Sequence, residues 1–272
     1  MKYIFFGTPD FSKIILEKLI LANMPPMSVV TNPDRPIGRK KIITPSHVKK
    51  LIQDLGSKIQ ILQPEHLDHQ FIQEVKNLGA EIGVLAAYGK IIPQELIDAF
   101  PKGIIVVHPS LLPKYRGATP IQSVILAGEQ ETGTTLIVMD DKVDHGAIIS
   151  NSQFSISNDD NFETLSKKLA DLSADLLIET LPKYYSGEIK PELQNHEEAT
   201  YTKKFATEDG FVDLEKNSPE EIWRKIKALN PEPGVYTFKD GRRMKILEAD
   251  LIDGKLVLKK IQFEGEKPKI LI

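Results

Sequence analysis

The sequence contains no cysteine among its 272 residues. Disulfides, thiolate zinc sites and cysteine nucleophiles are therefore excluded. The sequence also has no apolar run that approaches the roughly 20 residues of a membrane-spanning helix. Its first residues form a short apolar run that turns at once into Gly-Thr-Pro-Asp, which indicates a first strand and not a signal peptide. We expect a cytoplasmic enzyme or binding protein with no membrane partner.

Several catalytic motifs are missing as well. Only one glycine, Gly7, follows the first apolar run, where a dinucleotide-binding fold would carry Gly-x-Gly-x-x-Gly, so nicotinamide binding is not expected. Ser110 has no Gly-x-Ser-x-Gly sequence around it, which argues against a serine nucleophile. The six histidines show no ligand spacing such as His-Glu-x-x-His, so we expect no metal site.

The composition is that of a soluble globular protein, with 41% hydrophobic and 27% charged residues and a formal net charge of −3. The length suits one large domain or two unequal ones. The charge is uneven, because one short stretch gathers positive residues opposed only by Asp34: Arg35, Arg39, Lys40, Lys41, Lys49 and Lys50. Such a cluster is either a solvated surface loop or a patch that contacts phosphates.

Strand-like and helical patterns alternate along the first 190 residues. Short apolar runs predict strands at 2–6, 27–30, 59–62, 82–87 and 104–107, and helical spacing predicts helices at 11–22, 48–55 and 71–78. This order predicts an α/β fold with a doubly wound, mostly parallel sheet.

The remaining segments predict two further strands at 134–139 and 147–149, a long helix at 162–178 and a helix at 219–229 capped by Ser218. Asp240-Gly241 and Asp253-Gly254 are hairpin signals. We expect a catalytic domain over 1–188, a linker over 189–207 and a small C-terminal β-barrel domain over 208–272.

Two polar residues follow strand-like runs, His108 and Asp144. In open α/β sheets, ligands collect at the carboxyl ends of the strands, where such residues converge. An aspartate beside a histidine fixes its tautomer and stabilises its charged form, which suits general acid–base catalysis. A buried structural histidine and an unrelated turn aspartate remain the alternative.

Six segments in order carry a resemblance to a known family: FFGTPDFS (5–12), TNPDRPIGRKK with TPSHVK (31–49), AAYGKIIP (86–93), HPSLLPKYRGATPIQ (108–122), ETGTTLIVMDDKVDHGAII (131–149) and ALNPEPGVYT (228–237). Together they span both expected domains. The chain resembles the methionyl-tRNA formyltransferases. The resemblance implies a formyltransferase-type catalytic domain and an OB-like, tRNA-binding C-terminal domain, which is shortened in this chain.

The resemblance also implies an activity. Such enzymes transfer a formyl group from 10-formyltetrahydrofolate to the amino group of methionyl initiator tRNA in translation initiation. The folate is a co-substrate, no metal takes part, and we expect a monomer whose partners are the folate and the tRNA.

The resemblance assigns roles to particular residues. His108 and Asp144 match the histidine and aspartate of the family's Asn-His-Asp triad. The residues expected to bind folate are Ser110, Leu111, Leu112, Pro113, Tyr88, Gly89 and Ile91. Those expected to contact tRNA are Arg39, Lys40 and Lys41.

One position departs from the family pattern. Val106 stands where the family has the asparagine thought to donate a hydrogen bond to the formyl oxygen. Loss of one such donor typically slows a reaction by about 10²–10³-fold. Val106 therefore keeps open a catalytically impaired homologue that binds folate and RNA. A sugar-nucleotide N-formyltransferase, which shares the catalytic domain and the folate, is the other alternative.

Overall fold

The computed structural model describes residues 1–38 and 40–271, so Arg39, an expected tRNA contact, lies outside the described residues. The chain divides into two compact units. The first comprises Met1–Arg116, Gly133–Phe154 and Lys167–Thr200, and the second comprises Gly117–Thr132, Ser155–Ser166 and Tyr201–Ile272.

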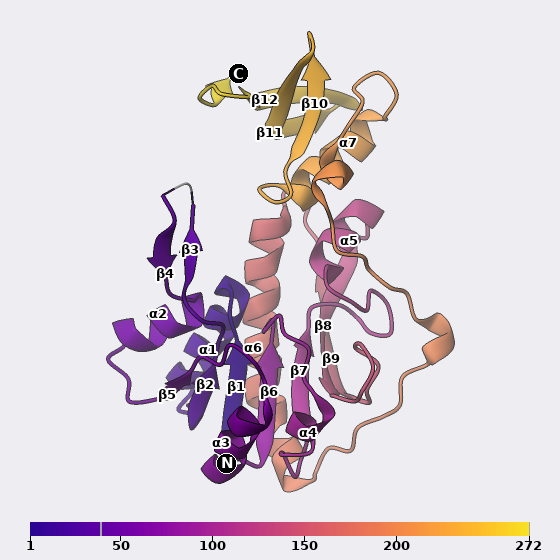
Figure 1. Ribbon diagram of the computed structural model, residues 1–272. Coiled ribbons are helices and arrows are strands. Elements are labelled where there is room, and N and C mark those ends of the chain that lie inside the picture. The colour runs from indigo at the N-terminus through magenta and orange to yellow at the C-terminus, as the bar shows by residue number, and fades with distance from the viewer. Residues whose placement is uncertain (39, 272) are drawn as a thin grey trace. The chain divides into compact units, whose positions relative to one another are not determined.

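A seven-stranded sheet lies mostly in the first unit and has the strand order β5-β2-β1-β6-β7-β8-β9 (Figure 1). Strands β5, β2, β1, β6 and β7 pair in parallel, and β8 pairs antiparallel with β7. The predicted mostly parallel sheet is thus confirmed. The strand bounds are β1 Tyr3–Gly7, β2 Ser28–Val30, β5 Gln60–Leu62, β6 Ile82–Ala86, β7 Ile104–His108, β8 Glu131–Val138 and β9 Ile148–Ser155.

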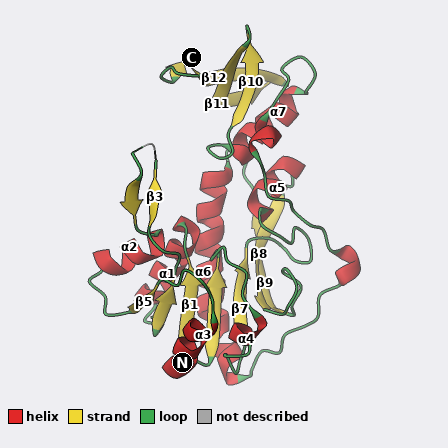
Figure 2. Ribbon diagram, in the orientation of Figure 1, coloured by secondary structure: helices red, strands yellow, loops and turns green. Residues whose placement is uncertain are grey.

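Helices alternate with these strands (Figure 2). They are α1 Asp10–Leu21, α2 His47–Asp54, α3 His69–Leu78, α4 Gln94–Ile97, α5 Pro120–Ala127 and α6 Phe162–Ser186. Local signals explain where some of them begin and end. Ser46 and Asp68 cap α2 and α3 by accepting hydrogen bonds from backbone N–H groups, and Gly79 ends α3 in a left-handed conformation.

The core of the first unit lies against the central strands. All five residues of β1 and all five of β7 are buried, as expected for strands covered on both faces. Phe6 contacts Tyr88 and Phe100 edge to face, with ring centroids 5.7 and 6.0 Å apart. Burial of each such ring stabilises the fold by about 1.5–3 kcal/mol.

The basic segment contains a hairpin that the sequence patterns do not predict, formed by β3 Arg35–Ile37 and β4 Ile42–Thr44. Its base is held by Lys49, whose Nζ lies 2.8 Å from Asp34 Oδ2 and 2.7 Å from Gln63 Oε1. Hydrogen bonds from Gln63 and then Lys49 lower the pKa of Asp34. Lys49 therefore serves the structure of the hairpin.

The second unit contains α5, α7 Pro219–Leu229 and a four-stranded antiparallel sheet. The strands are β10 Val235–Lys239, β11 Arg242–Ile252, β12 Lys255–Phe263 and β13 Lys269–Ile270. Asp240-Gly241 forms the turn between β10 and β11, and Asp253-Gly254 the turn between β11 and β12; all four residues have positive φ. The small C-terminal β domain is confirmed as this antiparallel sheet.

Helix α7 begins where the sequence predicts. The Ser218 side chain accepts from Glu221 N, and the Glu221 carboxylate accepts from Ser218 N, so the two residues form a capping box. We expect Ser218→Ala to lower the free energy of unfolding by about 1 kcal/mol, whereas Ser218→Asp keeps most of the stability. Urea denaturation followed by Trp223 fluorescence measures both. Equal stability of the two variants would show that the cap contributes nothing.

Candidate active site

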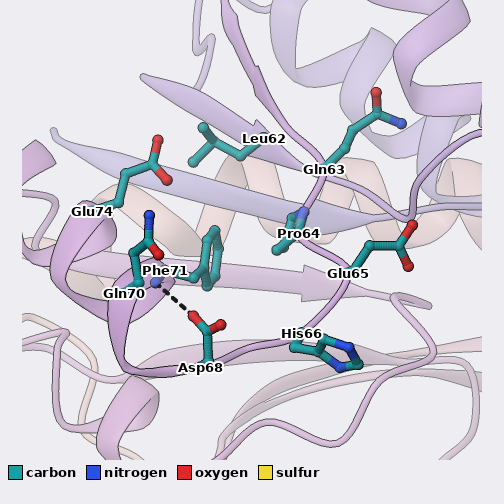
Figure 3. A pocket seen from close by; sticks show the side chains of 9 residues that line it. All are labelled: Leu62, Gln63, Pro64, Glu65, His66, Asp68, Gln70, Phe71 and Glu74. Carbon is teal, nitrogen blue, oxygen red and sulfur yellow. Dashed lines mark hydrogen bonds between the residues drawn. The ribbon is translucent and has the colours of Figure 1, made fainter.

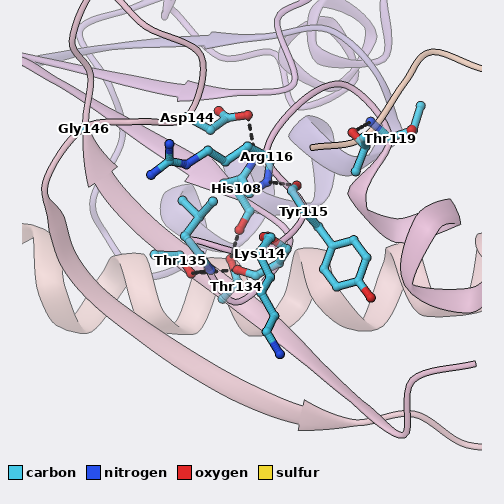
Figure 4. Close-up of polar contacts among 12 residues, drawn as sticks. His108, Lys114, Tyr115, Arg116, Thr119, Thr134, Thr135, Asp144 and Gly146 are labelled. Atoms are coloured by element: carbon cyan, nitrogen blue, oxygen red, sulfur yellow. Dashed lines mark hydrogen bonds and ion pairs between the residues drawn. The ribbon is translucent and has the colours of Figure 1, made fainter. Parts of the chain in front are cut away.

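His108 ends strand β7 with only 4% of its surface exposed. Its Nε2 lies 2.9 Å from the Tyr115 carbonyl oxygen, and its Nδ1 lies 3.5 Å from Asp144 Oδ2 (Figure 4). A carbonyl oxygen only accepts hydrogen bonds, so Nε2 donates to it. Nδ1 is then the ring nitrogen that faces the carboxylate. The structure thus brings His108 and Asp144 together, as expected from their positions in the sequence.

The turn after β8, over residues 139–147, brings Asp144 to this position. Asp144 has a φ of +48°, a left-handed conformation that is uncommon outside glycine and more accessible to aspartate than to most residues. Val138 N donates to Ala147 O at 2.9 Å and closes the turn. A Cβ on Gly146 would lie 1.8 Å from Val138 O, so only glycine fits there. The turn therefore folds the chain back toward the end of β7.

The loop after His108 is held by Thr135, which lies opposite His108 in the register of β7 and β8. Thr135 Oγ1 donates to Ser110 O at 2.7 Å and accepts from Leu112 N at 3.1 Å. Ser110 Oγ in turn donates to Lys114 O at 2.7 Å. These bonds fold the Ser-Leu-Leu-Pro segment over the sheet. No pattern in the sequence points to Thr135, because its partners depend on the register of β7 and β8.

Val106 lies in an apolar cluster. It is 7% exposed and packs with Leu112 and Ile137, and the partly buried Leu85 and Met139 lie against them. A valine at this position is well accommodated by its neighbours. It places no hydrogen-bond donor two residues before His108.

The residues expected to bind folate differ in exposure. Ser110 is fully buried and Leu112 is 7% exposed, so both side chains serve the loop itself. The Tyr88 side chain is 1% exposed, and burial raises its pKa to about 12. Gly89 is exposed, and Ile91 exposes 95% of its surface. Leu111 and Pro113 are half-buried.

The Tyr88 backbone has a clear structural role. Its carbonyl oxygen accepts from Thr8 Oγ1 at 3.2 Å and from Asn32 Nδ2 at 3.1 Å. These bonds tie together the segments that follow β1, β2 and β6, which are the carboxyl ends of three parallel strands. The buried Tyr88 thus holds these three segments together at the carboxyl edge of the sheet.

The basic hairpin exposes both Lys40 and Lys41 between β3 and β4. Arg35, in contrast, forms an ion pair with Glu65, with Nη2 2.7 Å from Oε2. Ile42 and Ile43 add exposed apolar surface, at 62% and 64%. The hairpin therefore presents lysines and aliphatic side chains to solvent.

A separate hollow of about 330 Å³ lies between β5 and α3 (Figure 3). Three carboxylates, Glu65, Asp68 and Glu74, are among the residues that line it. Asp68 accepts from Phe71 N as the cap of α3. Like charges repel, so this hollow does not suit an anionic folate or a phosphate backbone.

No group of three or more acidic, histidine or cysteine side chains able to hold a metal occurs within residues 1–38 and 40–271. In that same described part of the chain, every helix is too short or too polar to cross a bilayer.

Two family models match the chain. The formyl transferase model matches residues 1–181, and the model of the formyl transferase C-terminal domain matches residues 204–256. The chain belongs to the formyl transferase family. The matched segments include His108, Asp144 and the basic hairpin.

Curated relatives and solved structures agree with this assignment. The methionyl-tRNA formyltransferase of Caldanaerobacter subterraneus is 42% identical over 255 residues, which cover 93% of this chain and 82% of that protein. The solved methionyl-tRNA formyltransferase of Clostridium thermocellum superposes with a TM-score of 0.63 at 18% identity, covering 97% of this chain and 98% of that one. An N-formyltransferase of Helicobacter canadensis, solved with folinic acid and dTDP-3-aminofucose, gives a TM-score of 0.67 at 18% identity over 93% and 88% of the two chains.

Thr135 offers a direct test of how the loop is held. We expect Thr135→Val to lower the free energy of unfolding by about 2 kcal/mol or more, because it leaves Ser110 O and Leu112 N buried without their partner. Thr135→Ser keeps the hydroxyl and serves as the matched control. Thermal and urea unfolding measure both variants. A valine variant as stable as the serine variant would show that these bonds do not hold the loop.

Proposed function

We propose that this protein transfers a formyl group from 10-formyltetrahydrofolate to the α-amino group of methionyl initiator tRNA. The observation that carries the proposal is the His108–Asp144 pair at the end of β7, in a chain that aligns over most of its length with methionyl-tRNA formyltransferases. We further propose that it works in the cytoplasm as a monomer.

The proposed chemistry is an acyl transfer. A bond forms between the uncharged methionyl amine and the formyl carbon, and the bond from that carbon to N10 of the folate breaks. One proton leaves the amine and one reaches N10. We assign the transfer of this proton to His108 Nδ1, because Nε2 is engaged by the Tyr115 carbonyl. Asp144 stabilises the ring while it holds the proton.

The formyl oxygen gains negative charge during the reaction and needs a hydrogen-bond donor. Valine cannot donate, so this role falls to the protonated ring of His108 or to a backbone N–H group. The same observation favours a second candidate, an impaired homologue that binds folate and RNA without turnover. The apolar neighbours of Val106, including Leu112 and Ile137, support that candidate.

The residues near the strand ends fit a folate. Ile91 offers an exposed aliphatic side chain against which a pterin ring can pack, and Gly89 exposes backbone beside it. Of the residues expected to bind folate, we propose that these two contact the ligand directly, together with the half-buried Leu111 and Pro113. Ser110, Leu112 and Tyr88 then hold the surrounding backbone.

The activity test uses purified protein, 10-formyltetrahydrofolate and charged initiator tRNA. We expect formyl transfer by the unaltered protein, and a loss of kcat of about 10²–10⁴-fold in His108→Gln and Asp144→Asn, because each removes the proton-carrying pair. A nucleotide-linked aminosugar replaces the tRNA in a parallel assay.

The outcomes separate the candidates. Turnover with the aminosugar but not with tRNA would assign the protein to the sugar-modifying enzymes. Binding of both ligands without turnover, with activity gained in Val106→Asn, would establish the impaired homologue. Near-normal kcat in both the His108 and Asp144 variants would remove the pair from the mechanism.

The basic hairpin supports RNA as the acceptor. If Lys40 and Lys41 contact tRNA phosphates, each alanine substitution removes about one unit from the slope of log affinity against log salt. We expect Lys40→Ala and Lys41→Ala to raise KM for tRNA and leave KM for folate unchanged. Lys58→Ala, at another exposed lysine, is the control. A salt slope equal to that of the unaltered protein would place the tRNA elsewhere.

A further inference from the structure

Residues 192–200, expected to form part of a linker, run along the active site as a segment that we call the strap. Ile148 and Glu192 exchange both backbone hydrogen bonds, at 2.7 and 2.8 Å. Farther along, Thr200 Oγ1 accepts from Tyr115 N at 2.8 Å. The strap therefore joins the start of β9 to the loop whose carbonyl holds His108.

Gln194 is the buried residue of the strap, with 5% of its surface exposed. Its Nε2 donates to Asp144 O at 2.9 Å and to Gly146 O at 2.8 Å. Both hydrogens of the amide are thus directed at the turn that carries Asp144. The two carbonyls lie on either side of His145, so the bonds fix the backbone of the turn at two points.

Arg116 fixes the direction of this amide. It is 1% exposed, and its Nε and Nη2 lie 3.2 and 2.6 Å from Gln194 Oε1. A guanidinium group only donates, so the Gln194 oxygen must face it and the amide nitrogen must face Asp144. Arg116 follows Tyr115 directly in the sequence. The Arg116–Gln194 pair therefore links the loop after His108 with the turn that carries Asp144.

His196 supports this arrangement from the far side of Arg116. Its Nδ1 accepts from Arg116 Nη2 at 2.8 Å, which requires an unprotonated nitrogen. Its ring stacks on His145 at 4.0 Å between centroids, and His145 Nδ1 lies 2.6 Å from Asp140. Burial, then His145, Arg116 and Lys142, lower the pKa of His196, while Asp140 opposes them.

We infer that Gln194 is a positioning residue for Asp144: by donating to Asp144 O and Gly146 O it holds the carboxylate within reach of His108. The inference rests on the proposed function and assigns part of the active site to the strap. It gives the buried arginine and glutamine beside the pair a role in holding the turn that carries Asp144. Asp144 alone would not stay in place easily, since its left-handed backbone is a strained conformation for a residue with a side chain.

The decisive variant is Gln194→Glu. It keeps the length of the side chain and the oxygen that accepts from Arg116, but it turns a carboxylate oxygen toward the two carbonyls. We expect kcat to fall between about tenfold and about a hundredfold, because a small displacement of a catalytic group costs that much. KM for folate and for tRNA should stay within about twofold, since the inference gives Gln194 a role in positioning Asp144 and none in binding either ligand. Gln60→Glu, at an exposed glutamine on β5, is the matched control.

A double variant separates positioning from a general loss of structure. If Gln194 acts through Asp144, the change Gln194→Glu should cost nothing further in the Asp144→Asn background. Losses that multiply in the double variant would overturn the inference. So would an equal rise in both KM values with kcat unchanged.

A measurement that needs no enzymatic turnover tests the role of Gln194 even where the protein is inactive with tRNA. Hydrogen–deuterium exchange followed by mass spectrometry should show faster exchange over residues 140–147 in Gln194→Glu than in the unaltered protein or in Gln60→Glu. Inactivity of the unaltered protein would count against the proposed function alone. Unchanged exchange over 140–147 would overturn the role of Gln194, whatever the activity.

Discussion

The antiparallel pairing of β7 with β8 is the constraint on which the active site depends. It sets His108 opposite Thr135 and places the turn after β8 beside the end of β7. Every other strand pair described between β5 and β7 is parallel, so this is where the chain reverses its direction in the sheet. The reversal brings together two segments 36 positions apart that supply His108 and Asp144, the proposed acid–base pair.

This arrangement makes the polar groups at the edge of the sheet interdependent. The loop after His108 is bonded to β8 through Thr135, and the Asp144 turn is bonded to the strap through Gln194. Buried polar groups of this kind are costly unless each finds a partner, so the network favours one arrangement of both loops. Such rigidity suits acyl transfer, in which a proton carrier must be held in place before the reaction begins.

Much of this could be predicted from the sequence, and the limits have physical causes. Continuous apolar runs predict the buried strands, and His108 and Asp144 follow from their place after two of them. Thr135, Arg116 and Gln194 could not be found in this way. Gln194 lies 78 residues from Arg116 in the sequence. Their contact forms only when the chain folds, so no local sequence pattern indicates it. The motif around Tyr88 gives its position but not that its ring fills the core beside Phe6.

Val106 shows how a single position can alter the demands on the rest of the site. Its neighbours are apolar, so the amide of an asparagine there would find no hydrogen-bond partner among the side chains of that cluster. With valine in place, the proposed mechanism leaves stabilisation of the formyl oxygen to the protonated ring of His108 or to a backbone N–H group. The ring can serve both as proton carrier and as donor only if Asp144 stays near Nδ1 throughout the reaction. If the ring takes both roles in the proposed mechanism, the bonds that hold Asp144 in place, and with them the strap, matter more with a valine at position 106 than with an asparagine.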